Sequence, residues 1–322
     1  MDNILITSAG QRVSLVKAFQ KELKKISESS KVYTVDLNPI LAPACHVSDG
    51  YKSVPRVTDS NYIDSLLSIC KEWGIKLIIP TIDTELAVLS EYRHLFSAEG
   101  IIPIVSSEEF IQACRDKRII NEFFIDKGVE IPTPMNKNAL TFPLFIKPYD
   151  GSLSKDIFLI NKEEELTEYH LTNPKLMFME YIDTKLYDEY TVDCYYNKNN
   201  ELCCAVPRKR IFVRAGEINK GVTHKNELVG FIKDKLQHID GAIGCLTMQF
   251  FFNQDNKRIV AIEINSRFGG GYPLSYLAGA NYPKWLIQEY ILNETVGYTD
   301  EWESNLLMLR YDAEVLVNGY EG

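Results

Sequence analysis

Two apolar runs in the last third of the chain could carry polar groups into one site. Residues 245–252 read CLTMQFFF and residues 258–265 read RIVAIEIN. The short segment between them is rich in turn-forming residues, so the three pieces together predict a β-hairpin. With the turn centred near Asn256, Gln249 lies directly opposite Glu263 on the neighbouring strand.

Three oxygen-bearing side chains share one face of this predicted hairpin. Glu263 and Asn265 are two positions apart and point the same way, and Gln249 faces them from the other strand. One carboxylate and two carboxamides suit Mg²⁺, which prefers oxygen ligands and usually binds one or two carboxylates together with substrate phosphates and water. The alternative is a solvated hairpin face with ordinary polar residues. The residues alone leave both interpretations open.

The segment that follows directly, residues 266–273, reads SRFGGGYP. The guanidinium of Arg267 could meet a phosphate or a carboxylate, and the glycines would let the backbone approach a bound group closely. A flexible turn between a strand and a helix is the alternative. The position immediately after the candidate metal strand favours the functional interpretation.

Two segments in the middle of the chain could hold a nucleotide. Lys147 ends an apolar run and leads into a loop at Gly151 and Ser152, so it could contact phosphates that the loop covers. An ordinary surface hairpin is the alternative. Apolar and acidic residues alternate over 178–193, where apolar side chains would enclose a base and a carboxylate would accept hydrogen bonds from a ribose. An amphipathic edge strand fits that second segment equally well.

The elements that must position these residues fall into two patterns. Up to about residue 105, apolar runs alternate with helical spacings, which predicts a doubly wound α/β domain with a parallel sheet. Strands are expected at 3–7, 32–35, 77–79 and 101–105, and helices at 13–23, 62–73 and 86–96. The first turn reads TSAGQR and departs from G-x-G-x-x-G, so we do not expect a dinucleotide site.

Near residue 110 the pattern changes to an α+β arrangement with antiparallel sheets. Strands are expected at 144–147, 157–160, 176–181, 190–196, 202–207, 245–252 and 258–265, with a strand-like tail at 306–317. Helices are expected at 110–113, 117–124, 163–169, 225–238 and 282–292.

Composition narrows the classes of partner. The chain has 322 residues, which predicts two or three subdomains, and a net charge of −9, which disfavours nucleic acid. Its one dense basic patch, at Arg208, Arg210 and Arg214, is too short for a duplex but suits a single phosphate or carboxylate. No apolar stretch approaches a membrane span, and the N-terminus resembles a first strand and not a signal peptide, so a cytoplasmic protein is expected. The seven cysteines are expected to be reduced, and of the histidines only His224 is kept as a possible substrate contact.

Taken in order, these segments resemble the ATP-grasp superfamily, and most closely the short single-unit relatives of the carbamoyl-phosphate synthase large subunit. The resemblance covers nearly the whole chain and is most specific at IIPTIDTEL (78–86), EYTVD (189–193), VPRKRIFVRAGEINKG (206–221) and IEINSRFGGGYPLS (262–275). It implies a Rossmann-like pre-ATP-grasp domain over 1–110 and a two-lobed ATP-grasp domain over 111–322. The small lobe is expected at about 118–182 and the large lobe at about 183–322.

The resemblance also implies roles, position by position. Nucleotide contacts are expected at Lys117, Lys147, Gly151, Ser152, Glu180, Tyr181, Ile182 and Glu189, with the three residues 180–182 beside adenine and Glu189 on the ribose. Mg²⁺, or Mn²⁺ in its place, is expected on Gln249, Glu263 and Asn265. The transferred phosphate is expected at Arg267, and the acceptor substrate near Arg208, Arg210 and Arg214. The phosphate loop departs from the family pattern because it holds one glycine where members often carry several.

The activity that the resemblance implies is an ATP-dependent carboxylate–amine ligase that forms an acyl phosphate, with small-molecule carboxylate and amine substrates. A small-molecule kinase that releases a phosphorylated product is an alternative, and a non-catalytic ATP-binding module is another. A homodimer through the N-terminal domain is compatible with the sequence, which does not determine the oligomeric state.

Overall fold

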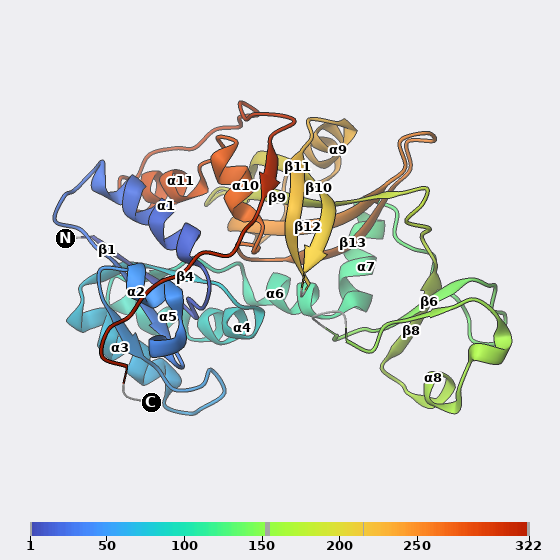
Figure 1. Cartoon of the computed structure of the whole chain (residues 1–322), viewed down its shortest axis with the longest axis horizontal. Helices are drawn as coiled ribbons and strands as arrows, with labels where there is room; N and C mark the ends of the chain where they lie inside the picture. The colour runs from blue at the N-terminus through green and yellow to red at the C-terminus, as the bar shows by residue number, and fades with distance from the viewer. Residues whose placement is uncertain (1, 152–154, 215, 321–322) are drawn as a thin grey trace.

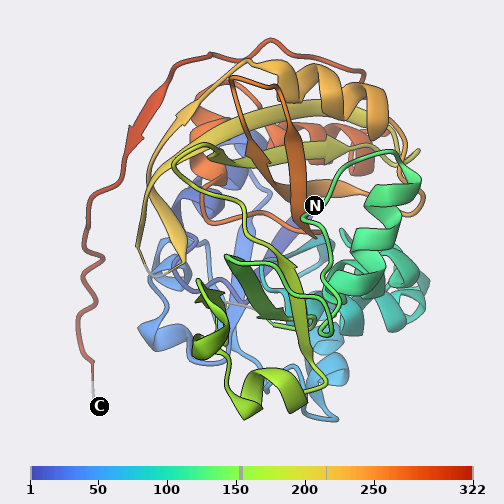
Figure 2. The ribbon, with the colours of Figure 1, turned by 90° about the vertical axis from the view of Figure 1, so that its right-hand side faces the viewer.

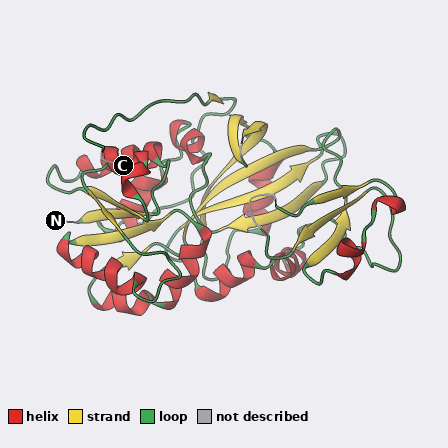
Figure 3. Cartoon of the chain, turned by 60° about the horizontal axis from the view of Figure 1, so that its bottom comes forward, coloured by secondary structure: helices red, strands yellow, loops and turns green. Residues whose placement is uncertain are grey.

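Three sheets make up the framework of the chain in a computed structural model, which describes residues 2–151, 155–214 and 216–320. Along the sequence they come as a five-stranded, a three-stranded and a six-stranded sheet. In space the six-stranded sheet lies between the other two, with the N-terminal domain at the left of Figure 1 and the three-stranded sheet at the right. Figure 3 shows helices flanking each part. The predicted fold, a parallel-sheet domain followed by antiparallel lobes, is confirmed.

The N-terminal sheet is parallel throughout, in the order β3-β2-β1-β4-β5. Its strands are β1 (Asn3–Thr7), β2 (Val32–Asp36), β3 (Tyr51–Ser53), β4 (Ile75–Pro80) and β5 (Ile102–Pro103). Its helices are α1 (Val13–Lys24), α2 (Pro43–Val47), α3 (Tyr62–Glu72), α4 (Asp83–Glu91) and α5 (Arg93–Ala98), with a 3-10 turn η1 (Pro39–Leu41). All five residues of β1 are buried, as expected for a central strand covered on both faces. The single helix predicted over 86–96 is wrong: the chain leaves helical geometry at Tyr92, which separates α4 from α5.

The three-stranded sheet is antiparallel, in the order β7-β6-β8. Its strands are β6 (Leu144–Pro148), β7 (Phe158–Ile160) and β8 (Leu176–Glu180), accompanied by a 3-10 turn η2 (Glu163–Glu165) and α8 (Glu168–Thr172). The helix predicted over 163–169 is wrong, because the 3-10 turn η2 ends at Glu165 and α8 starts separately after Thr167. Among its described residues five form the buried hydrophobic cluster, so this part of the lobe has little apolar burial of its own.

The six-stranded sheet is antiparallel, in the order β13-β12-β9-β10-β11-β14. Its strands are β9 (Asp188–Tyr196), β10 (Leu202–Arg214), β11 (Glu217–Thr223), β12 (Gly244–Phe252), β13 (Ile259–Asn265) and β14 (Leu307–Leu309). The neighbouring helices are α6 (Glu108–Arg115), α7 (Lys117–Asp126), α9 (Glu227–Lys235), α10 (Tyr272–Leu277) and α11 (Tyr282–Tyr290). One face packs on α7 and α9 through side chains such as Phe124, Leu228 and Ile232.

Two predictions for this sheet need correction, and one strand was missed. The strand expected at 202–207 continues to Arg214, because residues 208–214 pair with β11, a strand that sequence reasoning missed. The tail predicted as a strand over 306–317 pairs only at β14, on the outer edge of the sheet. Beyond β14 the tail runs down one side of the molecule (Figure 2), with no partner strand among the described residues.

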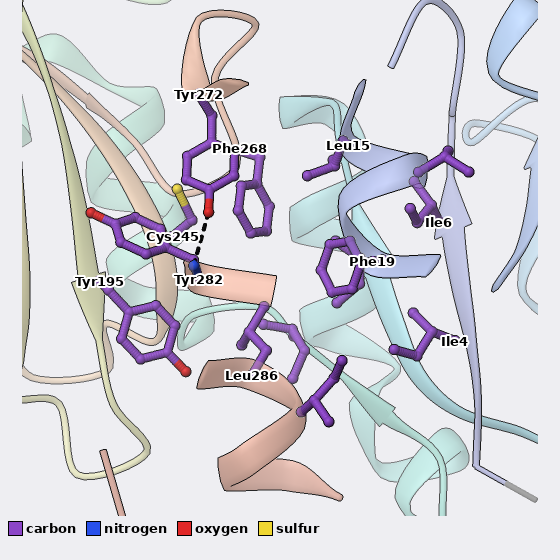
Figure 4. Close-up of a cluster of buried hydrophobic side chains, with 14 of the residues drawn as sticks. Ile4, Ile6, Leu15, Phe19, Tyr195, Cys245, Phe268, Tyr272, Tyr282 and Leu286 are labelled. Carbon is purple, nitrogen blue, oxygen red and sulfur yellow. Dashed lines mark hydrogen bonds between the residues drawn. The ribbon is translucent and has the colours of Figure 1, made fainter. Parts of the chain in front are cut away.

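The N-terminal domain and the six-stranded sheet share one hydrophobic core. Figure 4 shows Ile4, Phe19 and their neighbours on β1 and α1 facing Phe268, Tyr282 and the residues around them. The rings of Phe19 and Phe268 meet edge to face, with centroids 6.0 Å apart. Fully burying a side chain of this size contributes about 1.5–3 kcal/mol. A site between these two parts therefore has walls fixed by packing.

In the described part of the chain, no helix is both long and apolar enough to cross a bilayer.

Candidate functional site

The hairpin of β12 and β13 brings the three predicted metal ligands together. Gln249 pairs with Glu263 in the strand register, as the turn position predicted. The amides of Gln249 and Asn265 each donate a hydrogen bond to Glu263 Oε1, both at 3.0 Å. The Glu263 side chain is 27% exposed, so a ligand can reach it.

These donors fit a Mg²⁺ ion that substrate phosphates complete. The described residues contain no cluster of three or more His, Cys, Asp or Glu, so the chain does not offer an all-protein cage there. It offers one carboxylate flanked by two carboxamides, and turning either amide about its last bond exchanges the nitrogen for the oxygen. Mg²⁺ commonly takes one or two carboxylates and fills its remaining positions with phosphate oxygens and water.

Two lysines from different elements stand beside Glu263. Lys117, the first residue of α7, donates to the backbone oxygen of Gly151 at 2.6 Å and lies 3.9 Å from Glu263 Oε2. Lys147, on β6, is buried. Burial, together with the charge of Lys117, lowers the pKa of Lys147 to about 8, and Glu263 opposes the shift. Two cations beside one carboxylate, at the junction of two lobes, form a pocket of charge suited to a polyphosphate.

The predicted phosphate loop is described at Gly151. Ser152, together with residues 153 and 154, lies outside the described residues. Gly151 is described, and a side chain at this position would collide with the ring of Pro148.

Arg267 links the metal strand to the N-terminal domain. Its guanidinium donates to Asp83 Oδ2 at 2.6 Å, and Asp83 is the first residue of α4. The Nε atom of Arg267 is buried and has no partner among the described residues. Sequence reasoning singled out the segment containing Asp83 without assigning the residue a role. The available signal was its position directly after the buried strand β4, where side chains of parallel sheets gather.

The three glycines after Arg267 pack against the protein's own polar side chains. A Cβ on Gly269 would lie 3.0 Å from Thr247 Oγ1. A Cβ on Gly270 would overlap the carboxylate of Glu217, and one on Gly271 would overlap the guanidinium of Arg208. These glycines therefore have a packing role of their own, because an added Cβ would meet a neighbouring side chain at each of them.

The three arginines of the basic patch have separate partners. Arg208 is only 1% exposed and binds Asp193 through two hydrogen bonds of 2.7 and 2.9 Å. Arg210 lies 3.1 Å from Glu189, and Arg214 pairs with Asp312 on the exposed tail. The structure thus keeps Arg210 beside Glu189, the predicted ribose contact, and encloses Arg208 within the core.

The predicted hinge segment is bound through Glu180. Arg258 donates to both of its carboxylate oxygens, at 2.8 and 3.1 Å, and Thr133 also donates to it. The hydrogen bonds from Arg258 are the main reason that the pKa of Glu180 falls to about 2. This side chain is therefore occupied by a protein contact that joins β8 to the start of β13. Tyr181 and Ile182 follow it outside the strand, with Ile182 buried.

Glu189 is a residue of β9, and His224 contacts the next residue of that strand, Tyr190. Burial raises the pKa of Glu189, although Arg210 opposes the shift. The His224 ring nitrogen Nδ1 is 2.9 Å from the hydroxyl of Tyr190, and burial lowers its pKa. Tyr190 belongs to the core on the face of the sheet that packs against α7 and α9, so His224 is a packing neighbour of that core.

Two family profiles match separate parts of the chain. Residues 4–104 match a profile described as PylC-like, N-terminal domain. Residues 172–311 match one described as ATP-grasp in the biosynthetic pathway with Ter operon, and this segment holds the hairpin of Gln249, Glu263 and Asn265. Residues 172–311 are thus identified as part of an ATP-grasp domain.

One curated protein and two solved structures illustrate what the chain is similar to. A carbamoyl-phosphate synthase from Methanobrevibacter smithii is 25% identical over 236 residues, which are 65% of this chain and 61% of that protein. The chain therefore spans less than two thirds of the length of this relative. The biotin carboxylase domain of Hydrogenobacter thermophilus 2-oxoglutarate carboxylase, in complex with MgADP, ADP and bicarbonate, superposes with a TM-score of 0.72 at 14% identity, over 94% of this chain and 73% of that one. N5-carboxyaminoimidazole synthetase from Staphylococcus aureus, in complex with ADP, superposes with a TM-score of 0.70 at 16% identity. The match covers 92% of this chain and 79% of that one.

Proposed function

We propose that this ATP-grasp chain is an ATP- and Mg²⁺-dependent ligase that joins a small-molecule carboxylate to an amine through an acyl phosphate. The observation that carries the proposal is the convergence of Lys117, Lys147 and Glu263 from three elements, with the two carboxamides beside Glu263. The solved structures of similar fold in complex with ADP support a nucleotide at the junction of the lobes.

The chemistry has two steps. An oxygen of the acceptor carboxylate attacks the γ-phosphorus of ATP, the bond from that phosphorus to the β–γ bridging oxygen breaks, and ADP leaves. The amine nitrogen then attacks the carbonyl carbon of the acyl phosphate, inorganic phosphate leaves with the bonding electrons, and the nitrogen loses a proton. Phosphoryl transfer of this kind needs alignment and positive charge more than covalent help from the protein.

The chain's own residues supply that alignment. Lys147 and Lys117 hold the polyphosphate as point charges, and Arg267, fixed by Asp83, faces the phosphoryl group as it moves. Gln249, Glu263 and Asn265 would hold Mg²⁺, which neutralises charge on the phosphates. The backbone of residues 180–182 would border the adenine, because the Glu180 side chain is held by Arg258.

The experiment is ADP release from MgATP over a panel of amino acids and small carboxylates, each with and without candidate amines. Glu263→Gln should abolish release, whereas Glu163→Gln, an exposed glutamate of η2, should leave it unchanged. Release that needs both a carboxylate and an amine supports the ligase. Release that needs one substrate and yields a phosphorylated product would identify a kinase, and full activity in Glu263→Gln would contradict the metal site. Use of Mn²⁺, a homodimer and a cytoplasmic location stay predictions.

A further inference from the structure

A cavity of about 250 Å³ lies between the N-terminal domain and the six-stranded sheet. One wall is the turn after β1, including Gly10 and Arg12, together with the turn after β4 at Thr81. The opposite wall is formed by Gly270 and by two residues to which the sequence analysis assigned no role, Glu217 and Arg310.

The place of this cavity in the fold is one where ligands bind. In the sheet order, β2 lies on one side of β1 and β4 on the other, so the chain reverses direction across the sheet beside β1. The crevice outside the carboxyl ends of parallel strands at such a point is the usual ligand site of open α/β sheets. Here the turns after β1 and β4 form the rim of that crevice.

Two arginines in the cavity keep hydrogen-bond donors unused. Arg12 lies 3.3 Å from Glu217, but among the described residues its side chain makes no hydrogen bond, and it is 20% exposed. Arg310 donates through one nitrogen to Glu217 at 3.2 Å and to the backbone oxygen of Ile218 at 3.1 Å. An arginine has five N–H donors, so both guanidinium groups can accept an additional oxyanion.

Glu217 lies between these two cations. Its two oxygens each face one arginine, and its carboxylate packs directly over Gly270. Two arginines and one carboxylate leave a net positive charge, and the side chain of Glu217 is 47% exposed and can turn away. A carboxylate between two arginines marks the position that a ligand's oxyanion would take.

The charged residues of the cavity lie close enough to the candidate phosphate site to interact with Arg267. Burial lowers the pKa of Arg12; Glu217 opposes this, and the charges of Arg267 and Arg310 add to it. Arg267 lies two residues before Gly269, and Gly269 and Gly270 line the cavity. A molecule bound here would therefore extend toward Arg267.

We propose that this cavity binds an oxyanion of the acceptor substrate, a carboxylate or a phosphate, on Arg12 and Arg310, and that Glu217 holds the place until the acceptor enters. That the anion belongs to an acceptor substrate rests on the proposed ligase function. That an anion binds here rests on the cavity alone. It moves the acceptor contact from the patch at 208–214 to residues supplied by the first turn of the chain and by the segment after β14. The C-terminal segment thus becomes part of the substrate site.

The test is calorimetric titration of the full chain with inorganic phosphate and, separately, with succinate, each in the absence and presence of MgADP. Wild type should bind at least one anion, and the tighter of the two assigns the oxyanion. Arg12→Gln and Arg310→Gln should each weaken binding by roughly tenfold, since each removes charge-assisted hydrogen bonds. Glu217→Gln should tighten it, because an internal competitor is removed. Arg56→Gln, an exposed arginine of the same domain, is the matched control and should change nothing.

Each outcome decides the matter. No binding of either anion to wild type, equal binding by the arginine variants, or weaker binding by Glu217→Gln would overturn the proposal. Circular dichroism of the variants, with Arg12→Lys as a charge-retaining partner, separates lost binding from lost folding. MgADP binding without anion binding would leave the ligase proposal intact and remove this subsite. Anion binding without MgADP binding would leave this subsite intact and contradict the ligase proposal.

Discussion

Two charged clusters lie on the same face of the six-stranded sheet and have opposite environments. Glu263 and its amide neighbours are partly exposed beside two lysines. Asp193, two residues beyond Thr191 on the central strand β9, is fully buried with Arg208 and also accepts from Ser275 at 2.6 Å. The difference comes from what covers the sheet. Helices α10 and α11 and the glycine turn, residues 269–271, close over Asp193 and leave Glu263 open. An open cluster can exchange its partners for a ligand, whereas a closed cluster holds the fold together.

The largest contrast should appear in stability. Asp193→Asn leaves the Arg208 charge buried without its counter-ion and should lower the free energy of unfolding by about 3–5 kcal/mol. Glu263→Gln should leave thermal stability nearly unchanged, because its site is open to water. Thermal unfolding of both variants measures this. Equal destabilisation by the two would remove the distinction between the clusters.

The glycine turn that closes the buried cluster gives the next effect. In Gly271→Ala the new methyl group overlaps the Arg208 guanidinium, which is held in the core and cannot move aside. Overpacking of this kind usually costs about 1–3 kcal/mol. Gly230→Ala is the matched control, because nothing lies within contact distance of a Cβ there and the residue is in helix α9. Thermal unfolding should show a loss for the first variant alone, and a Gly271→Ala chain as stable as wild type would contradict the packing role.

Much of this face could be predicted from the sequence. Alternation along two apolar runs, with a turn between them, was enough to pair Gln249 with Glu263. The pattern could not tell the open cluster from the closed one, since Asp193 and Glu263 both alternate with apolar residues. Whether a cluster is open or closed depends on which distant elements of the chain cover the sheet there. Alternation within a strand carries no information about that coverage.

The missed residues have local reasons. β11 reads EINKGVT, with three buried positions, Ile218, Gly221 and Thr223, only one of them a large apolar residue, so its strand signal is weak. Arg310 enters the cavity only because β14 pairs with β11. Arg258 begins a predicted strand, and its contact with Glu180 depends on how the two lobes meet.

At the open cluster, Lys147 should make nucleotide binding depend on pH. Its pKa of about 8, lowered by burial and by Lys117, means that the ligand-free protein loses this charge as pH rises through 8. Phosphates favour the charged form, so binding above pH 8 must take up a proton and weakens by up to about tenfold per pH unit. Titration of MgADP between pH 7 and 9.5 measures the slope. The Lys147→Arg variant keeps the positive charge over this range and should show a flatter slope. The same slope in both proteins would mean that a group other than Lys147 titrates.

The smallest effect is expected at the junction of the lobes. Hydrogen bonds from Arg258 lower the pKa of Glu180 from an ordinary 4.5 to about 2. The pair therefore adds stability that is present above pH 4.5 and is lost as the pH falls toward 2. Both side chains are about a quarter exposed, so we expect about 1 kcal/mol of coupling. A double-mutant cycle with Glu180→Gln and Arg258→Gln at pH 7 and pH 3 measures it, and coupling that does not shrink at pH 3 would contradict the account.

The most direct test of the central claim is the effect of Mg²⁺ on the affinity for a non-hydrolysable ATP analogue, in wild type and in Glu263→Gln. The claim that Gln249, Glu263 and Asn265 hold the ion predicts that Mg²⁺ tightens binding to wild type by roughly tenfold or more and has little effect on the variant. Tightening of equal size in both proteins would show that the ion binds elsewhere, and would contradict the account of this site.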